Sequence, residues 1–229
     1  MRTHLGIRAP TNRTMSAAST GAMPLVEHLR ELRRRIVVSA VAIAVSLIPT
    51  WIYYAEIFAL LRAPFDQVAR DLGGNVELFM PGVADSFTLQ IQVTLVAAIV
   101  ISAPIWLLQL WGFITPGLHR NEKKWAYLFF FSATPLMAAG ATLAYKTLPI
   151  GLQILFGFTP DNVSNLVPVD KYFNFIFQMM AIFAIGFLTP LFLVMLNFAN
   201  LLTAKKIREW WRGFVMTIIL FAAIATPTG

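Results

Sequence analysis

The charged residues of this chain are gathered into a few short segments that separate five long uncharged stretches. These stretches cover 36–55, 86–119, 125–145, 172–204 and 213–229. A helix of about 18 to 20 apolar residues crosses the roughly 30 Å hydrocarbon core of a bilayer. A charged side chain at mid-depth costs at least ~2.5–3.5 kcal/mol. The pattern therefore predicts an all-α, polytopic membrane protein, with any charged-group chemistry at the membrane surfaces.

Composition agrees with a membrane class and excludes several kinds of chemistry. The chain is 58% hydrophobic and 13% charged, whereas soluble domains average about 25% charged residues. The chain has no cysteine, which excludes disulfides, cysteine-bound metals and thiol nucleophiles. His4, His28 and His119 are far apart in the sequence and lack a metal-ligand spacing. We therefore expect no metal, no cofactor and no nucleic-acid partner, and attribute the net charge of +7 to membrane topology.

The basic residues fall mainly on one side of the predicted membrane. If each stretch crosses once, 1–35, 112–124 and 199–212 share a side and hold 14 of the 18 Lys and Arg residues. Lys and Arg in short loops favour the cytoplasmic side. The N-terminus is therefore predicted to be cytoplasmic. Residues 1–22 are expected to form a disordered cytoplasmic tail, and residues 23–229 the membrane domain.

Five spans are expected within that domain. Their predicted bounds are 36–55, 88–111, 125–145, 172–198 and 213–226. Pro104, Pro135 and Pro190 lie inside spans two, three and four and are expected to bend them. The apolar segment 148–158 is expected to form a short helix on the outer surface, and the last span is short for a bilayer.

The first basic segment, MPLVEHLRELRRRI, predicts an amphipathic helix that leads into span one. Glu27 and Glu31 fall on one helix face, and Glu31 stands four residues before Arg35. Such a pair contributes about 0.2–0.5 kcal/mol. A simple juxtamembrane helix, held to anionic lipid by its arginines, accounts for the same residues. A cleaved export signal does not account for this segment, because the apolar run that follows it is longer than the 7–15 apolar residues of a signal peptide.

The second basic segment, WGFITPGLHRNEKKW, lies between spans two and three. Thr115, Pro116 and Gly117 predict a turn, and Glu122 precedes span three. A helix-start carboxylate stabilised by the helix dipole is the plain interpretation of Glu122.

Together the two segments resemble the TatC family, the receptor subunit of the twin-arginine protein translocase. The first matches the family pattern H-L-x-E-L-R-x-R at His28, Leu29, Glu31, Leu32, Arg33 and Arg35. The second matches F-x-x-P-x-L-x-x-x-E at Phe113, Pro116, Leu118 and Glu122. RAPF at 62–65 and ATPTG at 225–229 add to the likeness through Pro64 and Pro227, which are expected to be structural.

The resemblance implies a function at the cytoplasmic face of a bacterial or archaeal cytoplasmic membrane. Glu31 and Glu122 would receive the paired arginines of an export signal peptide, with the other motif residues lining the site. The family assembles with TatA- and TatB-type single-span subunits, self-associates in a receptor complex and uses the proton-motive force. It implies no enzyme activity and no nucleotide cofactor.

Two features depart from the family pattern. Many members carry a glutamate in span four, in an F-E-x-P setting, where this chain has Phe187, Leu188, Thr189 and Pro190. Thr189, or Gln178 and Asn174 in the same span, is expected to supply a polar contact instead. The family also has a sixth span, so the sequence is expected to be a fragment, or else a five-span variant.

Two other function classes remain as alternatives. A small-solute secondary transporter would place ionisable residues or interrupted helices at mid-membrane. An intramembrane enzyme would need a nucleophile–base pair or a carboxylate dyad in its spans. The predicted spans contain neither kind of group, which favours the translocase receptor.

Overall fold

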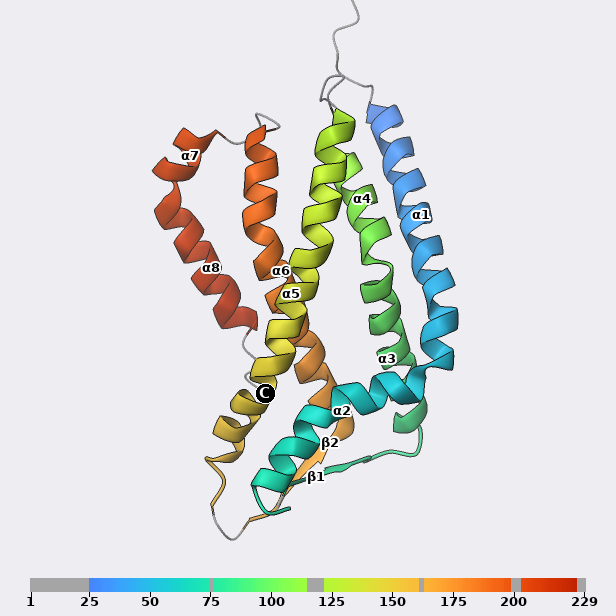
Figure 1. Cartoon of the computed structure of the whole chain (residues 1–229), viewed down its shortest axis with the longest axis vertical. Coiled ribbons are helices and arrows are strands. Elements are labelled where there is room, and N and C mark those ends of the chain that lie inside the picture. The colour runs from blue at the N-terminus through green and yellow to red at the C-terminus, as the bar shows by residue number, and fades with distance from the viewer. Residues whose placement is uncertain (1–24, 75, 115–121, 161–162, 199–202, 226–229) are drawn as a thin grey trace, which may run out of the picture.

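A computed structural model describes residues 25–74, 76–114, 122–160, 163–198 and 203–225. Long helices run side by side and dominate the molecule (Figure 1). The elements in chain order are α1 (Leu25–Ile52), α2 (Tyr54–Asp71), β1 (Val76–Phe79), α3 (Asp85–Ile101), α4 (Ala103–Ile114), α5 (Glu122–Phe156), β2 (Asn165–Pro168), α6 (Val169–Phe198), α7 (Ala204–Glu209) and α8 (Trp211–Ala225). The predicted helical class is correct, with a small sheet in addition.

Helices occupy the five predicted span regions, although their bounds differ from the expected ones. Among the described residues, two helical segments are long and apolar enough to cross a membrane, Glu27–Ile52 and Val169–Asn197. A bent pair, Asp85–Ile101 with Ala103–Phe113, would make a third. The count of five spans therefore remains a prediction. The tail at 1–22 lies outside the described residues.

The bend between α3 and α4 confirms the expected effect of Pro104. The two helices meet at about 60° around Ser102. The break leaves backbone carbonyls without their usual helical donors. Here the indole of Trp106 donates to the carbonyl of Ile99 at 2.9 Å, and the Ser102 hydroxyl donates to the same oxygen at 3.2 Å. Side chains thus satisfy the broken turn inside the bundle.

The segment after span one folds into α2, which the sequence analysis did not anticipate. Leu61, Phe65 and Val68 are buried along one face of this helix, at the spacing of an amphipathic helix. The Tyr172 hydroxyl of α6 donates to the carbonyl of Leu61 at 2.9 Å. Glycines at 73 and 74, both with positive φ, end the helix in a backbone conformation that favours glycine.

The prediction of a separate surface helix at 148–158 is wrong. Helix α5 continues through Pro149 to Phe156, and its buried Leu148 and Leu152 pack with α2 and α6. Burial against these neighbours stabilises the longer helix. Beside it, β1 and β2 form a two-stranded parallel sheet in which Val76 pairs with Asn165 and Phe79 with Pro168.

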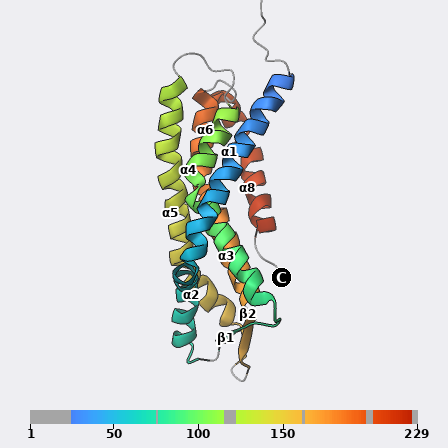
Figure 2. The ribbon, with the colours of Figure 1, turned by 90° about the vertical axis from the view of Figure 1, so that its right-hand side faces the viewer.

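Two buried clusters hold the helices together. One gathers α2, α3, α6 and the end of α5 around Phe65, Phe173 and Ile176. The other joins α4, α5 and α6 around Leu107, Phe129 and Met195. Figure 2 shows α1 crossing the bundle in front of α3 and α4, the two helices that it contacts.

Candidate functional site

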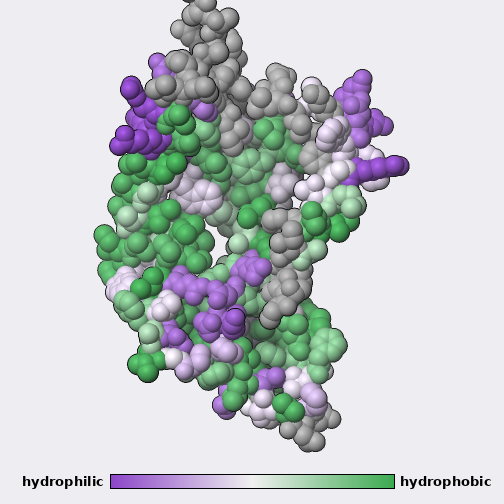
Figure 3. Space-filling model, turned by 180° about the vertical axis from the view of Figure 1, so that it is seen from behind, coloured by the Kyte–Doolittle hydropathy of each residue, from purple (hydrophilic) through white to green (hydrophobic). Residues whose placement is uncertain are grey.

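The sequence motifs converge at one end of the bundle, where α1 and α5 begin and α4 ends (Figure 1). We call this the α1 end. Seen from behind, strongly hydrophilic groups lie at this end on both sides of the molecule, and a broad apolar surface follows below (Figure 3). The α1 end therefore offers charged groups next to a surface suited to lipid.

Glu31 and Arg35 of α1 form an ion pair at the α1 end. The Arg35 Nε and Nη2 atoms both donate to Glu31 Oε1, the first at 3.0 Å. The two side chains are 25% and 28% exposed, so the pair is partly shielded from water. The predicted pairing of these residues at four-residue spacing is confirmed.

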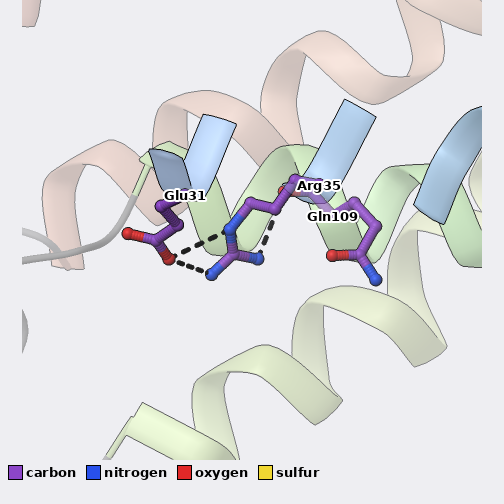
Figure 4. Close-up of polar contacts among 3 residues, drawn as sticks. All are labelled: Glu31, Arg35 and Gln109. Carbon is purple, nitrogen blue, oxygen red and sulfur yellow. Dashed lines mark hydrogen bonds and ion pairs between the residues drawn. The ribbon is translucent and has the colours of Figure 1, made fainter. Parts of the chain in front are cut away.

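Arg35 also connects α1 to α4. Its Nη1 donates to the backbone carbonyl of Gln109 at 3.4 Å, as the close-up shows (Figure 4). The guanidinium lies against Gly112, where a Cβ atom would overlap Nη1. The missing side chain at 112 therefore creates the space in which the guanidinium sits.

A ring contact joins the same two helices nearer the start of α1. His28 of α1 stacks on Phe113 of α4 with ring centroids 4.6 Å apart and planes inclined by 20°. His28 and Arg35 are seven residues apart, so they share a face of α1. On α4, Gln109, Gly112 and Phe113 share a face through their three- and four-residue spacing.

The sequence motifs located Phe113 but missed Gln109 and Gly112. Gln109 contributes its backbone carbonyl and Gly112 the lack of a side chain, so neither residue presents a chemical group that a motif would reveal. Their helical spacing from Phe113 was the available signal.

The other predicted binding residues are only partly brought together. Leu29 and Arg33 are exposed on α1. Pro116 and Leu118 lie outside the described residues. Glu122 is the first residue of α5, and its side chain is outside the described part of the structure.

The predicted structural prolines also have different environments. Pro64 is buried in α2, whereas Pro190 is exposed within α6. Pro227 lies outside the described residues.

Leu188, at the span-four position where the sequence analysis noted a departure from the family pattern, makes an apolar contact. Leu188 is 5% exposed and packs in the cluster that contains Phe129 and Met195. Nearby in α6, the Thr189 hydroxyl donates to the carbonyl of Ile185 at 2.9 Å, and Gln178 is half-buried.

Asn174, also expected as a polar residue of this span, makes a polar contact with α3. The Gln92 side chain of α3 donates to the Asn174 side chain of α6 at 2.5 Å. Within the described residues, no three His, Asp or Glu side chains gather as metal ligands would.

The apolar helices, the bent helix pair and the charged α1 end define a polytopic α-helical membrane protein. The family model for the Sec-independent protein translocase protein TatC matches residues 27–229. The chain therefore belongs to the TatC family.

Curated relatives support this membership. The chain is 36% identical over 214 residues to the Sec-independent protein translocase protein TatC of Frankia casuarinae, covering 90% of this chain and 59% of that protein. It is 34% identical over 222 residues to the TatC of Xylanimonas cellulosilytica, covering 96% of this chain and 80% of that protein. The chain thus spans less than two thirds of the Frankia relative.

Solved structures show the same fold. A crystal structure of the twin-arginine translocase receptor TatC in DDM matches with a TM-score of 0.76 and 26% identity, covering 88% of this chain and 89% of that one. A second crystal structure of this receptor matches with a TM-score of 0.74 and 28% identity, covering 88% of each chain.

Proposed function

We propose that this protein is the receptor subunit of a twin-arginine translocase and that its α1 end binds the paired arginines of export signals. The observation that carries the proposal is the partly shielded Glu31 carboxylate, held at the junction of α1 and α4. The similarity to crystal structures of twin-arginine translocase receptors supports the same role.

Two carboxylates on separate helices suit a ligand with two adjacent arginines. Glu31 lies on α1 and Glu122 begins α5. A guanidinium presents a planar fork of donors that matches a carboxylate, whereas the lysine ammonium acts as a point charge. Leu29, Phe113, Pro116 and Leu118 would contact the neighbouring part of the signal, and Arg33 would reject stray basic peptides.

The α1 end would face the cytoplasm. Arg30, Arg33 and Arg34 are exposed on α1, and Lys205 and Arg208 are exposed on α7, which begins at the same end (Figure 1). Basic residues near span ends favour the cytoplasmic side. The protein would thus lie in the cytoplasmic membrane of a bacterium or archaeon with its N-terminus inside.

The receptor would act with further subunits. We propose self-association and assembly with TatA- and TatB-type single-span proteins, with the proton-motive force driving export of folded proteins. Because Leu188 is packed in the core, contacts of α6 with such subunits would use Gln178 and Thr189 or apolar packing.

Photocrosslinking in membranes tests the signal-binding site. A twin-arginine signal peptide with a photoreactive residue beside the arginine pair should label the region around Glu122. Glu31→Gln and Glu122→Gln should each weaken binding about tenfold or more, because each removes a charge-assisted hydrogen bond. Replacing the peptide's arginines by lysines should have a similar effect.

Glu27→Gln is the matched control. Glu27 is exposed on α1 one turn before Glu31, so its loss removes the same charge without removing the proposed ligand contact. Labelling near Glu122 that persists with the twin-lysine peptide would contradict the proposal. Equal weakening by Glu27→Gln and Glu31→Gln would contradict the role of Glu31.

A further inference from the structure

The Glu31 carboxylate already has an arginine bound to it from its own chain. Arg35 donates from Nε and Nη2 to Glu31 Oε1, which is the kind of bond that a signal arginine would form. We infer that Arg35 is an internal competitor for Glu31 and sets the affinity threshold that a signal peptide must exceed. This inference rests on the proposed role of Glu31 in signal binding.

The geometry leaves only part of the carboxylate open. Both Arg35 donors go to Oε1, and the second oxygen of Glu31 points away from the guanidinium (Figure 4). A bidentate arginine–carboxylate pair needs two parallel hydrogen bonds to the two oxygens. An arriving guanidinium therefore reaches Glu31 in that geometry only when Arg35 leaves Oε1.

Helix α4 holds the competitor in place. The carbonyl of Gln109 accepts from Arg35 Nη1, and the glycine at 112 provides the space for the guanidinium. A side chain held on two sides loses little further freedom when it binds Glu31, so it competes effectively with a ligand from solution.

The free energy needed to displace Arg35 weakens the binding of every signal that contacts Glu31 in the two-oxygen geometry. The same amount is subtracted from the binding free energy of strong and weak signals, so the ratio of their affinities is unchanged. The absolute affinities fall, and weakly matched signals drop below useful binding. Arg35 thus sets the affinity threshold for binding and leaves the discrimination between signals, which is a difference of affinities, unchanged.

A binding titration with Arg35→Gln tests the inference. The full chain in lipid nanodiscs is titrated against a fluorescent twin-arginine signal peptide and a matched twin-lysine peptide. Removing a partly exposed ion pair of this kind should tighten binding of the twin-arginine peptide roughly two- to fivefold, and that of the twin-lysine peptide less, because an ammonium does not need both oxygens of Glu31. Arg34→Gln is the control, because Arg34 is exposed on the same helix and its loss changes the net charge equally.

Each outcome decides for or against the inference. Tighter binding by Arg35→Gln than by Arg34→Gln supports the competitor. Equal binding by the two variants would mean that Arg35 acts only through its positive charge. Weaker binding by Arg35→Gln would mean that Arg35 helps to form the binding site. Either result overturns the inference. If Arg35→Gln fails to fold, Arg35→Lys compared with Arg34→Lys replaces it, and Arg35→Lys should bind the twin-arginine peptide more tightly than Arg34→Lys does.

Failure of the proposed function gives a different result. In that case the unaltered protein binds twin-arginine and twin-lysine peptides equally. If the protein binds the twin-arginine peptide more tightly than the twin-lysine peptide, but Arg35→Gln leaves both affinities unchanged, the proposed function is supported and the role of Arg35 as a competitor is rejected.

Discussion

Two glycines are placed where helices need to approach each other closely. Gly112 leaves space for the Arg35 guanidinium between α1 and α4. Gly140 lies where α5 crosses α6, and a Cβ atom there would come within 2.6 Å of the Phe183 carbonyl oxygen. Small residues at such crossings let helix backbones pack together in a membrane.

The crossing at Gly140 leads to a prediction about stability. Gly140→Ala should lower the free energy of unfolding by about 1–3 kcal/mol, because backbone atoms of α6 must move to admit the methyl group. Gly151→Ala in the same helix is the control, since nothing lies within 4 Å of its Cβ position. Unfolding midpoints in detergent, followed by circular dichroism, compare the two. A Gly140→Ala protein as stable as the control would contradict the crossing geometry.

At the scale of elements, the bend between α3 and α4 positions α4 beside α1 at the α1 end. The 60° change of direction follows α3 and lets α4 run beside the first half of α1. Trp106 stabilises the bend because its indole donates to the Ile99 carbonyl inside the broken turn. The bend thereby sets where Gln109 and Gly112 meet Arg35.

Removing the indole donor should weaken the bend. Trp106→Phe keeps an aromatic ring but leaves the Ile99 carbonyl with only the Ser102 hydroxyl, and should lower the free energy of unfolding by about 1 kcal/mol. Trp51→Phe, at an exposed position on α1, should change it less. The same detergent unfolding experiment measures both variants, and an unchanged Trp106→Phe midpoint would exclude the indole as a support.

At the scale of the whole molecule, the uneven distribution of basic residues supports the proposed orientation in the membrane. Exposed basic residues of α1 and α7 lie at the α1 end, whereas β1, β2 and the loop before α3 lie at the opposite end (Figure 1). In a membrane this arrangement favours the α1 end inside.

Single cysteines can report that orientation, because the natural chain has none. Thr203→Cys, exposed before α7, should react with a membrane-impermeant maleimide only after cells are opened. Val83→Cys, in a fully exposed loop position, should react in cells whose cytoplasmic membrane is intact. The cysteine-free protein gives the background, and the reversed labelling pattern would refute the proposed orientation.

Local patterns predicted much of the helical fold and part of the site. The uncharged stretches correspond to helices because the bilayer excludes charge, and the spacing of Glu31 and Arg35 produced the expected pair. The same patterns did not predict α2, the parallel pairing of β1 and β2, or the extension of α5 to Phe156. Those elements depend on burial against partners that are distant in the sequence.

The sequence by itself determined that this is a helical membrane protein with carboxylates at its basic end, since charge and hydropathy act locally on each segment. The spacing also predicted the pair of Glu31 and Arg35, but only the tertiary structure decided that the paired Arg35 reaches α4 as well. That contact depends on a backbone carbonyl at Gln109 and an absent side chain at Gly112. Neither feature has a chemical signature in the sequence, because each acquires its role only when α1 and α4 pack together.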